Sequence, residues 1–433
     1  MKDTSPIKSA VSSAASYTGG GIRSHSILIV LSAIYIFDYA DRYVVASMID
    51  FIKRDWNITD AQAGWLMGIV LLFITVFVIP ASLLIDRWSR RKMVAIMTLF
   101  WSLATLACAF TKNYAQLIVV RAFIGIGEAG YAPGGTAMLA AAYPEEKRAR
   151  FMGIWNASIP LGVGIGMMAG GLIAKHWGWH HAFGLVAVPG MFLAIAAWFL
   201  PDYKSVRPDE SAMGFEADRG FFKKALGILR IPSLVFTYLG FAMNVAVTTS
   251  LMTWLPTYFE RTGLVEPGKG GTFAMPIFGL VLVGAPLGGF IADRWYRELK
   301  RSRLIFPAIT SGAAAVALLV AFLNPGKISQ IPILAIYGIF VTCFIAPAVS
   351  TTQEVVHPGL RAFSYGMCVI VQHLCGDIWS PPLIGKLSDI MGLEKAVLLI
   401  PGFGILAALS FFIGSRFYVR DLERVEKIRL EPE

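Results

Sequence analysis

Two stretches of sequence share one pattern and decide the fold: Ser82-Leu-Leu-Ile-Asp86-Arg87-Trp88-Ser-Arg90 and Gly289-Phe-Ile-Ala-Asp293-Arg294-Trp295-Tyr-Arg297. Each has a small residue, three apolar residues and then Asp-Arg-Trp-x-Arg, and each follows a long apolar run. Because one copy stands in each half of the chain, the pattern indicates an internal repeat of two equivalent halves.

The composition indicates a protein that is surrounded by lipid. The chain has 433 residues, of which 56% are hydrophobic and only 15% are charged, and its mean hydropathy is +0.63. A soluble chain usually carries about 25% charged residues. A surface that faces hydrocarbon explains both the excess of apolar residues and the shortage of charged ones.

The apolar runs have the length of membrane-spanning helices, which need about 20 mostly apolar residues. We predict an all-α membrane protein with twelve transmembrane helices in two pseudo-symmetric six-helix bundles. The predicted spans are Ile27–Asp50, Ala61–Asp86, Met93–Phe110, Tyr114–Tyr143, Ala149–His176, His181–Leu200, Pro232–Arg261, Gly271–Asp293, Leu304–Leu323, Ile331–Val355, Arg361–Asp389 and Ala396–Phe417. Thr59 and Gln62 have the spacing of a capping box at the start of the second span.

The charged residues indicate how the chain is oriented in the membrane. Lys and Arg are concentrated in the loops on the side of both termini, and cytoplasmic loops are the ones enriched in these residues, so we expect both termini in the cytoplasm. The predicted organisation is a disordered tail (1–25), an N-terminal six-helix bundle (26–200), a cytoplasmic linker with an amphipathic helix (201–230), a C-terminal six-helix bundle (231–418) and a second tail (419–433).

Several other classes of function are disfavoured. The net charge of +10 is not arranged as a basic stripe interleaved with aromatic residues, so we expect no nucleic-acid partner. We find no nucleophile motif, metal-ligand spacing or nucleotide-binding loop, so we predict neither an enzyme nor a cofactor or metal. The four cysteines lie in apolar runs and are expected to be buried packing residues.

Ionisable residues inside the predicted spans are costly in lipid and are therefore candidates for function. Asp38, Asp41 and Arg42 share a helical face in the first span, and Arg121 and Glu128 share one in the fourth. We predict that Arg42 lies between carboxylates of these two helices and faces a central cavity. The alternative is a static salt bridge that only stabilises the fold.

Further polar residues are candidates for lining the cavity. They are His373 and Asp377, which are four residues apart on the eleventh span, and Asn156 and Asn244. On the fifth span, Gly162, Gly166 and Gly170 form a ridge of small residues, which we interpret as a packing surface.

The repeated loop resembles the signature of the major facilitator superfamily, Gly-x-x-x-Asp-Arg-x-Gly-Arg-Arg/Lys. The first copy departs from it at Ser82 and Ser89. The resemblance implies the two-bundle fold of that superfamily and a gate on the cytoplasmic side, in which the Asp and Arg residues pair with neighbouring helices. The residues that match the gate are Asp86, Arg87, Arg90, Asp293, Arg294 and Arg297.

A closer resemblance rests on four quoted motifs: Asp38-Tyr-Ala-Asp41-Arg42, Arg121-Ala-Phe-Ile-Gly125-Ile-Gly127-Glu128-Ala129, Trp254-Leu-Pro-Thr-Tyr-Phe-Glu-Arg261 and His373-Leu-Cys-Gly376-Asp377-Ile-Trp-Ser380-Pro381. Together they resemble the spinster family, and a bacterial member in particular, over nearly the whole chain. This resemblance implies a proton-linked carrier of lipids such as lysophospholipids or sphingoid compounds, located in the bacterial inner membrane. It also implies that Asp41, Arg42 and Glu128 couple transport to protons. Arg121 matches the superfamily's fourth-helix Arg, which could organise this cluster, anchor the helix or touch an anionic substrate.

The distribution of side chains favours an amphiphilic substrate. The ionisable candidates lie mostly in the first half, whereas the second half contributes apolar candidates for the cavity wall, namely Phe241, Met243, Met252, Phe340 and Phe344. We therefore expect a monomeric, proton-coupled carrier of a lipid-like molecule that works by alternating access. The alternative is a proton-coupled organic-anion symporter on the same fold, in which Arg42 and Arg121 hold a carboxylate.

Overall fold

The computed structural model describes residues 22–143, 145–202, 227–323, 329–356 and 360–425. The helices of the first half are α2 (Ile22–Val44), η1 (Val45–Ser47), α3 (Ile49–Trp56), α4 (Asp60–Arg87), α5 (Arg90–Cys108), α6 (Tyr114–Glu128), α7 (Tyr131–Ala142), α8 (Glu145–Asn156), α9 (Ser158–Trp177) and α10 (Trp179–Trp198). Those of the second half are α12 (Pro232–Arg261), α13 (Gly270–Gly279), α14 (Val281–Tyr296), α15 (Ser302–Phe322), α16 (Gln330–Phe340), α17 (Ile345–Glu354), α18 (Arg361–Gln372), η3 (His373–Asp377), α19 (Ser380–Met391), α20 (Leu393–Ala396), η4 (Val397–Leu399) and α21 (Ile400–Glu423).

The protein is all-α, as predicted. Within the described part of the chain, ten helical stretches are long and apolar enough to cross a membrane. The predicted spans outside this set are the first and the eleventh. The first has Asp38, Asp41 and Arg42 close together in α2, and the eleventh is divided among α18, η3 and α19. Twelve helices are therefore consistent with the structure.

The helix starts are fixed by local capping. At the start of α4, Thr59 accepts from the backbone N–H of Gln62, and the Gln62 side chain accepts from the backbone N–H of Thr59, which confirms the predicted capping box. Asn113 caps α6 in the same manner by accepting from the N–H of Gln116. These caps satisfy backbone donors that the helix itself leaves unpaired.

The glycine ridge of α9 is a packing surface, as predicted, and its partner is α2. A Cβ atom added at Gly162, Gly166 or Gly170 would lie 2.3, 2.3 and 2.4 Å from backbone carbonyl oxygens of α2. Only residues without a side chain permit this approach. The packing fixes α2 against α9, and thereby directs the charged face of α2 towards α6.

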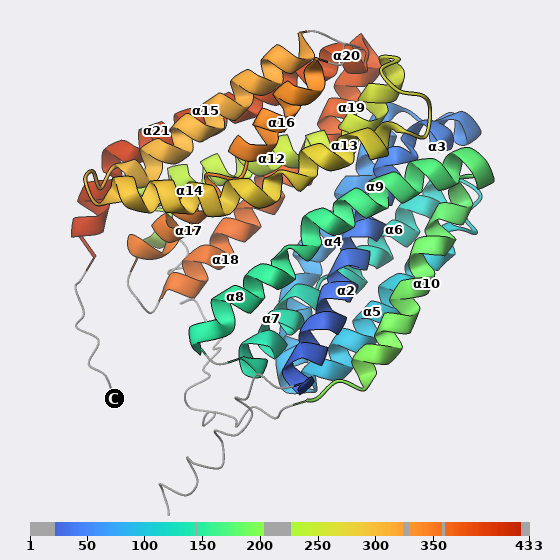
Figure 1. The fold of residues 1–433 in the computed structure, drawn as a ribbon, viewed down its shortest axis with the longest axis horizontal. Coiled ribbons are helices and arrows are strands. Elements are labelled where there is room, and N and C mark those ends of the chain that lie inside the picture. The colour runs from blue at the N-terminus through green and yellow to red at the C-terminus, as the bar shows by residue number, and fades with distance from the viewer. Residues whose placement is uncertain (1–21, 144, 203–226, 324–328, 357–359, 426–433) are drawn as a thin grey trace, which may run out of the picture.

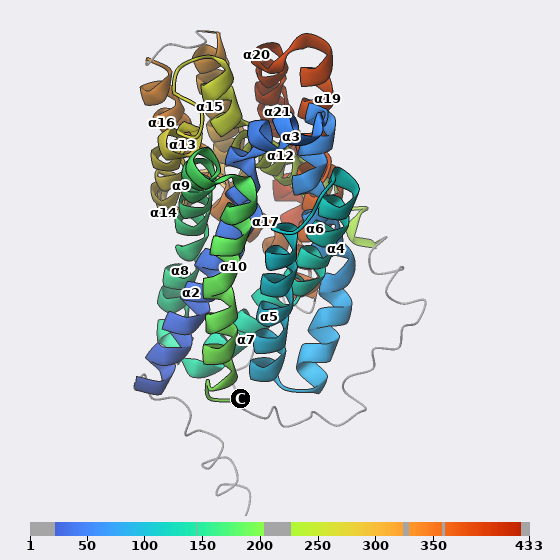
Figure 2. The same cartoon turned by 90° about the vertical axis from the view of Figure 1, so that its right-hand side faces the viewer.

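The two halves converge at one end of the molecule and diverge towards the other (Figure 1). They meet through α4 with α19 and η3, through α9 with α13, and through η1 with α12. Figure 2 shows the start of α2 at the end opposite to α3, and Figure 1 shows the end of α21 on the side away from α20. We call the two ends the closed end and the termini end.

Close backbone approach makes the closed end tight. A Cβ atom at Gly64 of α4 would lie 2.5 Å from the carbonyl oxygen of Pro381 in α19, and one at Gly271 of α13 would lie 2.1 Å from that of Met167 in α9. The halves therefore touch through their backbones at this end.

The predicted N-terminal tail and the linker with its amphipathic helix lie largely outside the described residues and stay predictions. The second bundle extends beyond residue 418, because α21 continues to Glu423 and the Asp421 carboxylate accepts from the Ser233 N–H at the start of α12.

The prediction for the cysteines was wrong at one position: Cys108, Cys343 and Cys368 are buried, but Cys375 is exposed, since it lies on the irregular turn η3.

Candidate functional site

A buried ion triad joins the first and fourth spans. The Arg42 guanidinium donates to Glu128 Oε2 from Nε and from a terminal nitrogen, at 3.1 and 2.7 Å, and to Asp38 Oδ2 at 3.3 Å. Its side chain is 11% exposed, against 3% for Asp38 and 1% for Glu128. The guanidinium also lies over the Tyr39 ring, 4.6 Å from its centroid, in a cation–π contact. The predicted bridge between the two helices is therefore present.

The fourth span is interrupted next to the ion triad, between α6 and α7. Helix α6 ends at Glu128, and α7 starts three residues later at Tyr131. Gly127 lies next to the carboxylate, and a Cβ atom there would lie 2.7 Å from that of Trp101 in α5. The interruption and the close packing together hold Glu128 at a fixed depth between α2 and α5.

Asp41 is the third carboxylate of the cluster and has a different environment. It is buried, and its Oδ2 lies within hydrogen-bond distance of the Thr105 hydroxyl of α5. The same hydroxyl lies 2.9 Å from the carbonyl oxygen of Trp101. Among the ion pairs of the described residues, none involves Asp41.

Arg121 is an anchor between helices. It is fully buried, and it donates from Nε to the Leu66 carbonyl oxygen of α4 at 2.5 Å and from a terminal nitrogen to that of Arg42 at 3.2 Å. Of the three roles considered from the sequence, this geometry favours anchoring, because no edge of the guanidinium reaches the surface in this conformation. Arg121 holds the backbone at Arg42 and so positions the ion triad.

His373 and Asp377 form a pair in the second half. His373 Nδ1 lies 2.9 Å from Asp377 Oδ2, and both belong to η3, a turn of π-helix between α18 and α19. π-Helical turns are rare and occur frequently at functional sites. This turn packs on α4 of the first half, where a Cβ atom at Gly68 would lie 2.5 Å from the Ile378 carbonyl oxygen. The sequence placed both residues on one face but did not indicate the π turn.

The other polar candidates occupy different environments. Asn244 is buried and donates to the Ser311 hydroxyl at 2.9 Å and to the Gly240 carbonyl oxygen at 3.3 Å, so it connects α12 to α15 within the second half. Asn156 is exposed at the junction of α8 and α9. Neither belongs to the ion triad.

The apolar wall predicted for the second half is only partly available. Phe241 and Phe344 are both buried and contact each other edge to face, with ring centroids 4.9 Å apart, and Phe344 also contacts Phe411. Their prediction as cavity-lining residues was wrong for this conformation, because the helix rotations place them in the packed interior of the bundle. Phe340 is exposed.

Comparison with known proteins agrees with this architecture. The family model of the Major Facilitator Superfamily matches residues 31–379. The chain belongs to the major facilitator superfamily. It is therefore an integral membrane protein and a transporter of small molecules.

Among curated proteins, this transporter is similar to the protein spinster homolog 1 of Xenopus tropicalis, with 28% identity over 440 residues that cover 93% of this chain and 83% of the relative. It is also similar to an MFS-type efflux pump of Mycolicibacterium smegmatis, with 25% identity and coverage of 93% and 95%. The fold resembles the crystal structure of a bacterial homolog of the human lysosomal transporter Spinster in an inward-facing conformation, with a TM-score of 0.80, 20% identity and coverage of 93% and 99%. These matches agree with the spinster-like motifs of the sequence.

Of the predicted gate residues, Asp293 has a described ion pair, and it lies within the second half. The Asp293 carboxylate pairs with Arg303 of α15 at 2.5 Å, and Arg303 pairs with Glu354 of α17 at 2.7 Å. Tyr418 donates to the same Glu354 carboxylate. Arg294 and Arg297 are exposed, Arg90 starts α5, and the side chains of Asp86 and Arg87 lie outside the described part. Gating by these residues stays a prediction.

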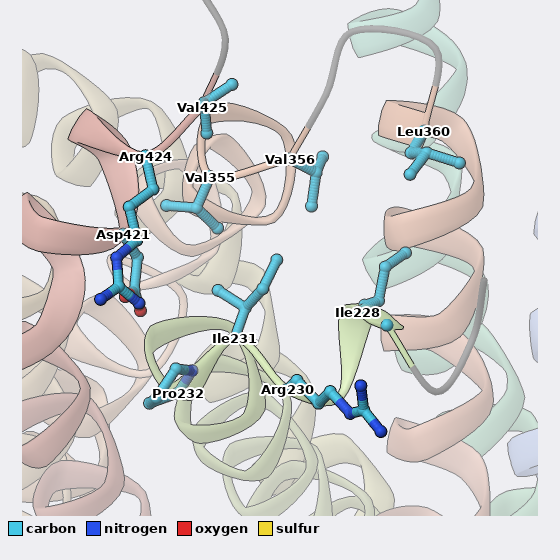
Figure 3. A pocket seen from close by; sticks show the side chains of 11 residues that line it. Ile228, Arg230, Ile231, Pro232, Val355, Val356, Leu360, Asp421, Arg424 and Val425 are labelled. Carbon is cyan, nitrogen blue, oxygen red and sulfur yellow. The ribbon is translucent and has the colours of Figure 1, made fainter. Parts of the chain in front are cut away.

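The described part of the chain also forms a pocket away from this site, where the linker ends. A cavity of about 550 Å³ at the termini end is lined by Ile228, Ile231, Val355 and their neighbours, with Arg230 and Arg424 at its rim (Figure 3). Its one carboxylate, Asp421, is already engaged by the start of α12. This pocket lies between the end of the linker and the second bundle.

The anchoring role of Arg121 leads to a test. Arg121→Lys keeps the charge but loses the planar fork that reaches two carbonyl oxygens. Losing a hydrogen bond to a charged group costs about 1.5–3 kcal/mol, so we expect a clearly lower melting temperature in detergent. The matched control is Arg54→Lys, since Arg54 makes an exposed contact with the Asp50 carbonyl oxygen. Equal melting temperatures for both variants would contradict the anchoring role.

Proposed function

We propose that the protein is a proton-coupled secondary active transporter of an amphiphilic, lipid-like substrate, and that it works by alternating access. The observation that carries the proposal is the buried cluster of Asp38, Asp41 and Glu128 around Arg42. We further propose that it is located in a bacterial inner membrane, with both termini in the cytoplasm and the closed end on the outer side.

The charge balance of the cluster supports a bound proton. Its three carboxyl groups face two guanidinium groups, those of Arg42 and Arg121, so full ionisation would bury one uncompensated negative charge. An uncompensated charge away from water costs several kcal/mol. One oxygen each of Asp38, Asp41 and Glu128 has no hydrogen-bond partner among the described residues. One proton on one carboxyl group would remove the excess charge.

The contacts of Thr105 support Asp41 as the carboxyl group that carries this proton. The Thr105 hydroxyl has one hydrogen and lies close to two acceptors, the Trp101 carbonyl oxygen and the Asp41 carboxyl group. One hydrogen can serve both acceptors only as a shared, bifurcated bond, whereas two full hydrogen bonds form if Thr105 donates to the carbonyl and accepts from a protonated Asp41. We assign Asp41 as the proton site in this conformation.

Coupling then follows from competition for Arg42. In this conformation Arg42 is bound by Glu128 and Asp38, so Asp41 is left without a cation. If Asp41 loses its proton, its new charge attracts Arg42 away from Glu128, which lies on another helix. A proton that changes which helices are paired has different affinities for two conformations, and this is the requirement for coupling.

The environment of the arginines favours the lipid-like substrate over the organic anion. An anion symporter needs a cation that is free to bind a carboxylate. Arg42 is held by two carboxylates and Arg121 by two backbone carbonyls. The resemblance to spinster proteins supports the lipid assignment independently.

The substrate class can be tested by transport into proteoliposomes. We expect an inward proton gradient to increase the transport of a lysophospholipid or sphingoid compound, and to leave a small carboxylate unaffected. The comparison uses the same vesicles with and without the gradient. Gradient-driven transport of the carboxylate alone would favour the organic-anion symporter.

The coupling residues can be tested with neutral isosteres. We expect Asp41→Asn and Glu128→Gln each to abolish gradient-driven accumulation in folded protein, because the volume is kept and the titratable group is lost. Arg42→Ala should be more damaging, because it leaves three carboxyl groups near a single remaining cation.

The control is Glu394→Gln, which neutralises an exposed carboxylate of α20. Melting temperature and pH-dependent transport are measured on the same samples. A static salt bridge would instead give lower melting temperatures with normal pH dependence in the surviving protein, and this outcome would refute the proposed coupling.

A further inference from the structure

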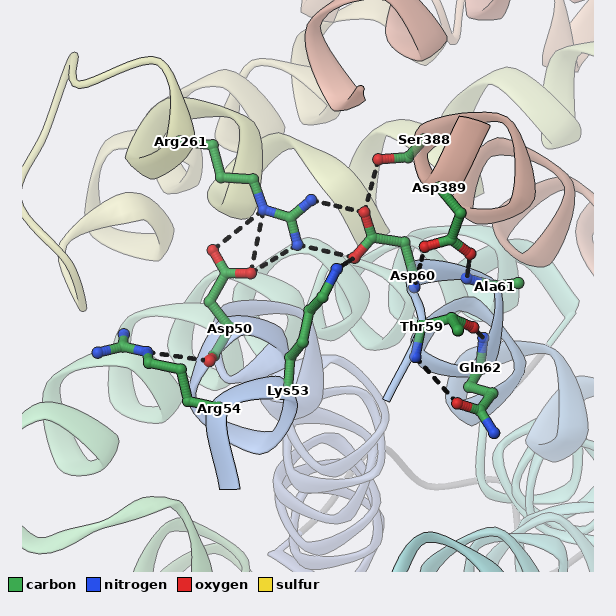
Figure 4. A network of polar contacts seen from close by, with 10 residues as sticks. All are labelled: Asp50, Lys53, Arg54, Thr59, Asp60, Ala61, Gln62, Arg261, Ser388 and Asp389. Atoms are coloured by element: carbon green, nitrogen blue, oxygen red, sulfur yellow. Dashed lines mark hydrogen bonds and ion pairs between the residues drawn. The ribbon is translucent and has the colours of Figure 1, made fainter. Parts of the chain in front are cut away.

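A second polar network lies at the closed end, away from the ion triad, and it connects the two halves (Figure 4). Its centre is Arg261, the last residue of α12. One edge of the guanidinium binds Asp50 of α3, with Nε at 3.0 Å and a terminal nitrogen at 2.6 Å from Oδ1. The terminal nitrogens also reach both oxygens of Asp60 of α4, at 2.6 and 2.8 Å. A cation of the second half therefore holds two carboxylates of the first.

Asp60 receives further donors from both halves. It is buried, and it accepts from Lys53 of its own half at 2.7 Å and from the Ser388 hydroxyl of α19 at 2.6 Å. Charge-assisted hydrogen bonds of this length are among the strong ones in proteins. Asp60 is thus the carboxylate that the second half holds most extensively.

Asp389 adds a helix cap that crosses the interface. Its carboxylate accepts from the backbone N–H groups of Asp60 and Ala61, at 2.7 and 2.9 Å, so a residue of α19 caps the first turn of α4. Helix N-termini attract negative charge because their first N–H groups are unpaired within the helix. The halves meet here without intervening side chains, since a Cβ atom at Gly385 would lie 2.2 Å from the Asp60 carbonyl oxygen.

Two groups of the first half in this network keep a partner from their own half, whereas the Asp50 carboxylate has Arg261 alone among the contacts described, although its side chain is 21% exposed. Asp60 has Lys53, and the start of α4 has the capping box of Thr59 and Gln62. Arg261 has no partner from its own half among the contacts described, because the two carboxylates that it binds both belong to the first half. Separation of the halves therefore leaves no buried unpaired carboxylate at Asp60 and transfers Arg261 to water. The contacts of Arg261 can therefore be broken and formed again in each transport cycle.

We propose that Arg261, Asp50, Asp60 and Asp389 form a latch between the halves, and that Arg261 is the positioning residue that sets the balance between the two access states. This inference rests on the alternating access proposed above. The latch holds the closed end shut while the ion triad is approached from the termini end, and it opens when access changes.

The test measures the separation of the halves directly. Spin labels are attached at Lys112→Cys and Glu394→Cys, two exposed positions at the closed end, one in each half, with Cys375→Ser removing the exposed native thiol. Distances are measured by pulsed electron paramagnetic resonance in lipid nanodiscs.

We expect Arg261→Gln to raise the ratio of separated to closed molecules about ten-fold, since loss of a largely buried cation leaves two carboxylates with one Lys. Arg261→Lys should lie between wild type and Arg261→Gln, because an ammonium group cannot bind both carboxylates as a fork.

The matched control is Lys175→Gln. Lys175 of α9 also pairs with a residue of the second half, Glu266, at 3.1 Å, but the Glu266 side chain is 65% exposed. Exposed pairs contribute little, so we expect a change of less than about two-fold. If Arg261→Gln is too unstable to label, Asp389→Ala should shift the ratio in the same direction, since it removes only the exposed carboxylate that caps α4.

The latch is refuted if Arg261→Gln, or Asp389→Ala in its place, gives the distance distribution of Lys175→Gln. The measurement needs neither substrate nor a proton gradient. Failure of proton-driven transport would therefore refute the proposed function and leave this result intact.

Discussion

The rest of the structure depends on one constraint, which is that Arg42 carries its charge inside the membrane-spanning part of the first half. A guanidinium cannot be deprotonated under biological conditions, so the surrounding helices must supply anions and hydrogen-bond acceptors. Glu128 and Asp38 bind it directly, and Arg121 fixes the backbone that presents it. The glycine ridge of α9 and the break after Glu128 are the packing features that permit this arrangement.

The sequence predicted the parts of this arrangement that follow from spacing. Asp38 and Arg42 are one helical turn apart, and Glu128 is a rare carboxylate within an apolar run, so their meeting could be expected. The repeated Asp-Arg-Trp-x-Arg loop was enough to predict the two halves, and the glycines of α9 were enough to predict a packing ridge. These patterns are local, so the spacing of residues within one segment of the sequence is enough to recognise them.

The sequence did not predict features that depend on helix rotation and on the register between distant helices. Thr105 is one of several hydroxyl residues in α5, and nothing in its neighbourhood distinguished it before α2 was placed beside it. Phe344 looked suitable for a cavity wall, yet the rotation of its helix buries it against Phe411. Asp60 and Arg261 could be recognised only as polar ends of spans, because they are 201 positions apart and meet across the interface. A pattern of charged residues at span ends on one side of the membrane would have been the only available signal.

The central claim is that Asp41 carries a proton while Arg42 is bound by Glu128 and Asp38. Infrared difference spectroscopy tests it most directly, because a protonated carboxyl group has a carbonyl stretching band that a carboxylate lacks. The account predicts such a band in the wild-type protein at transport-active pH, its loss in Asp41→Asn, and a shift of its frequency in Thr105→Val, which removes the hydroxyl that accepts the proton's hydrogen bond. A band that persists unchanged in Asp41→Asn would contradict the account.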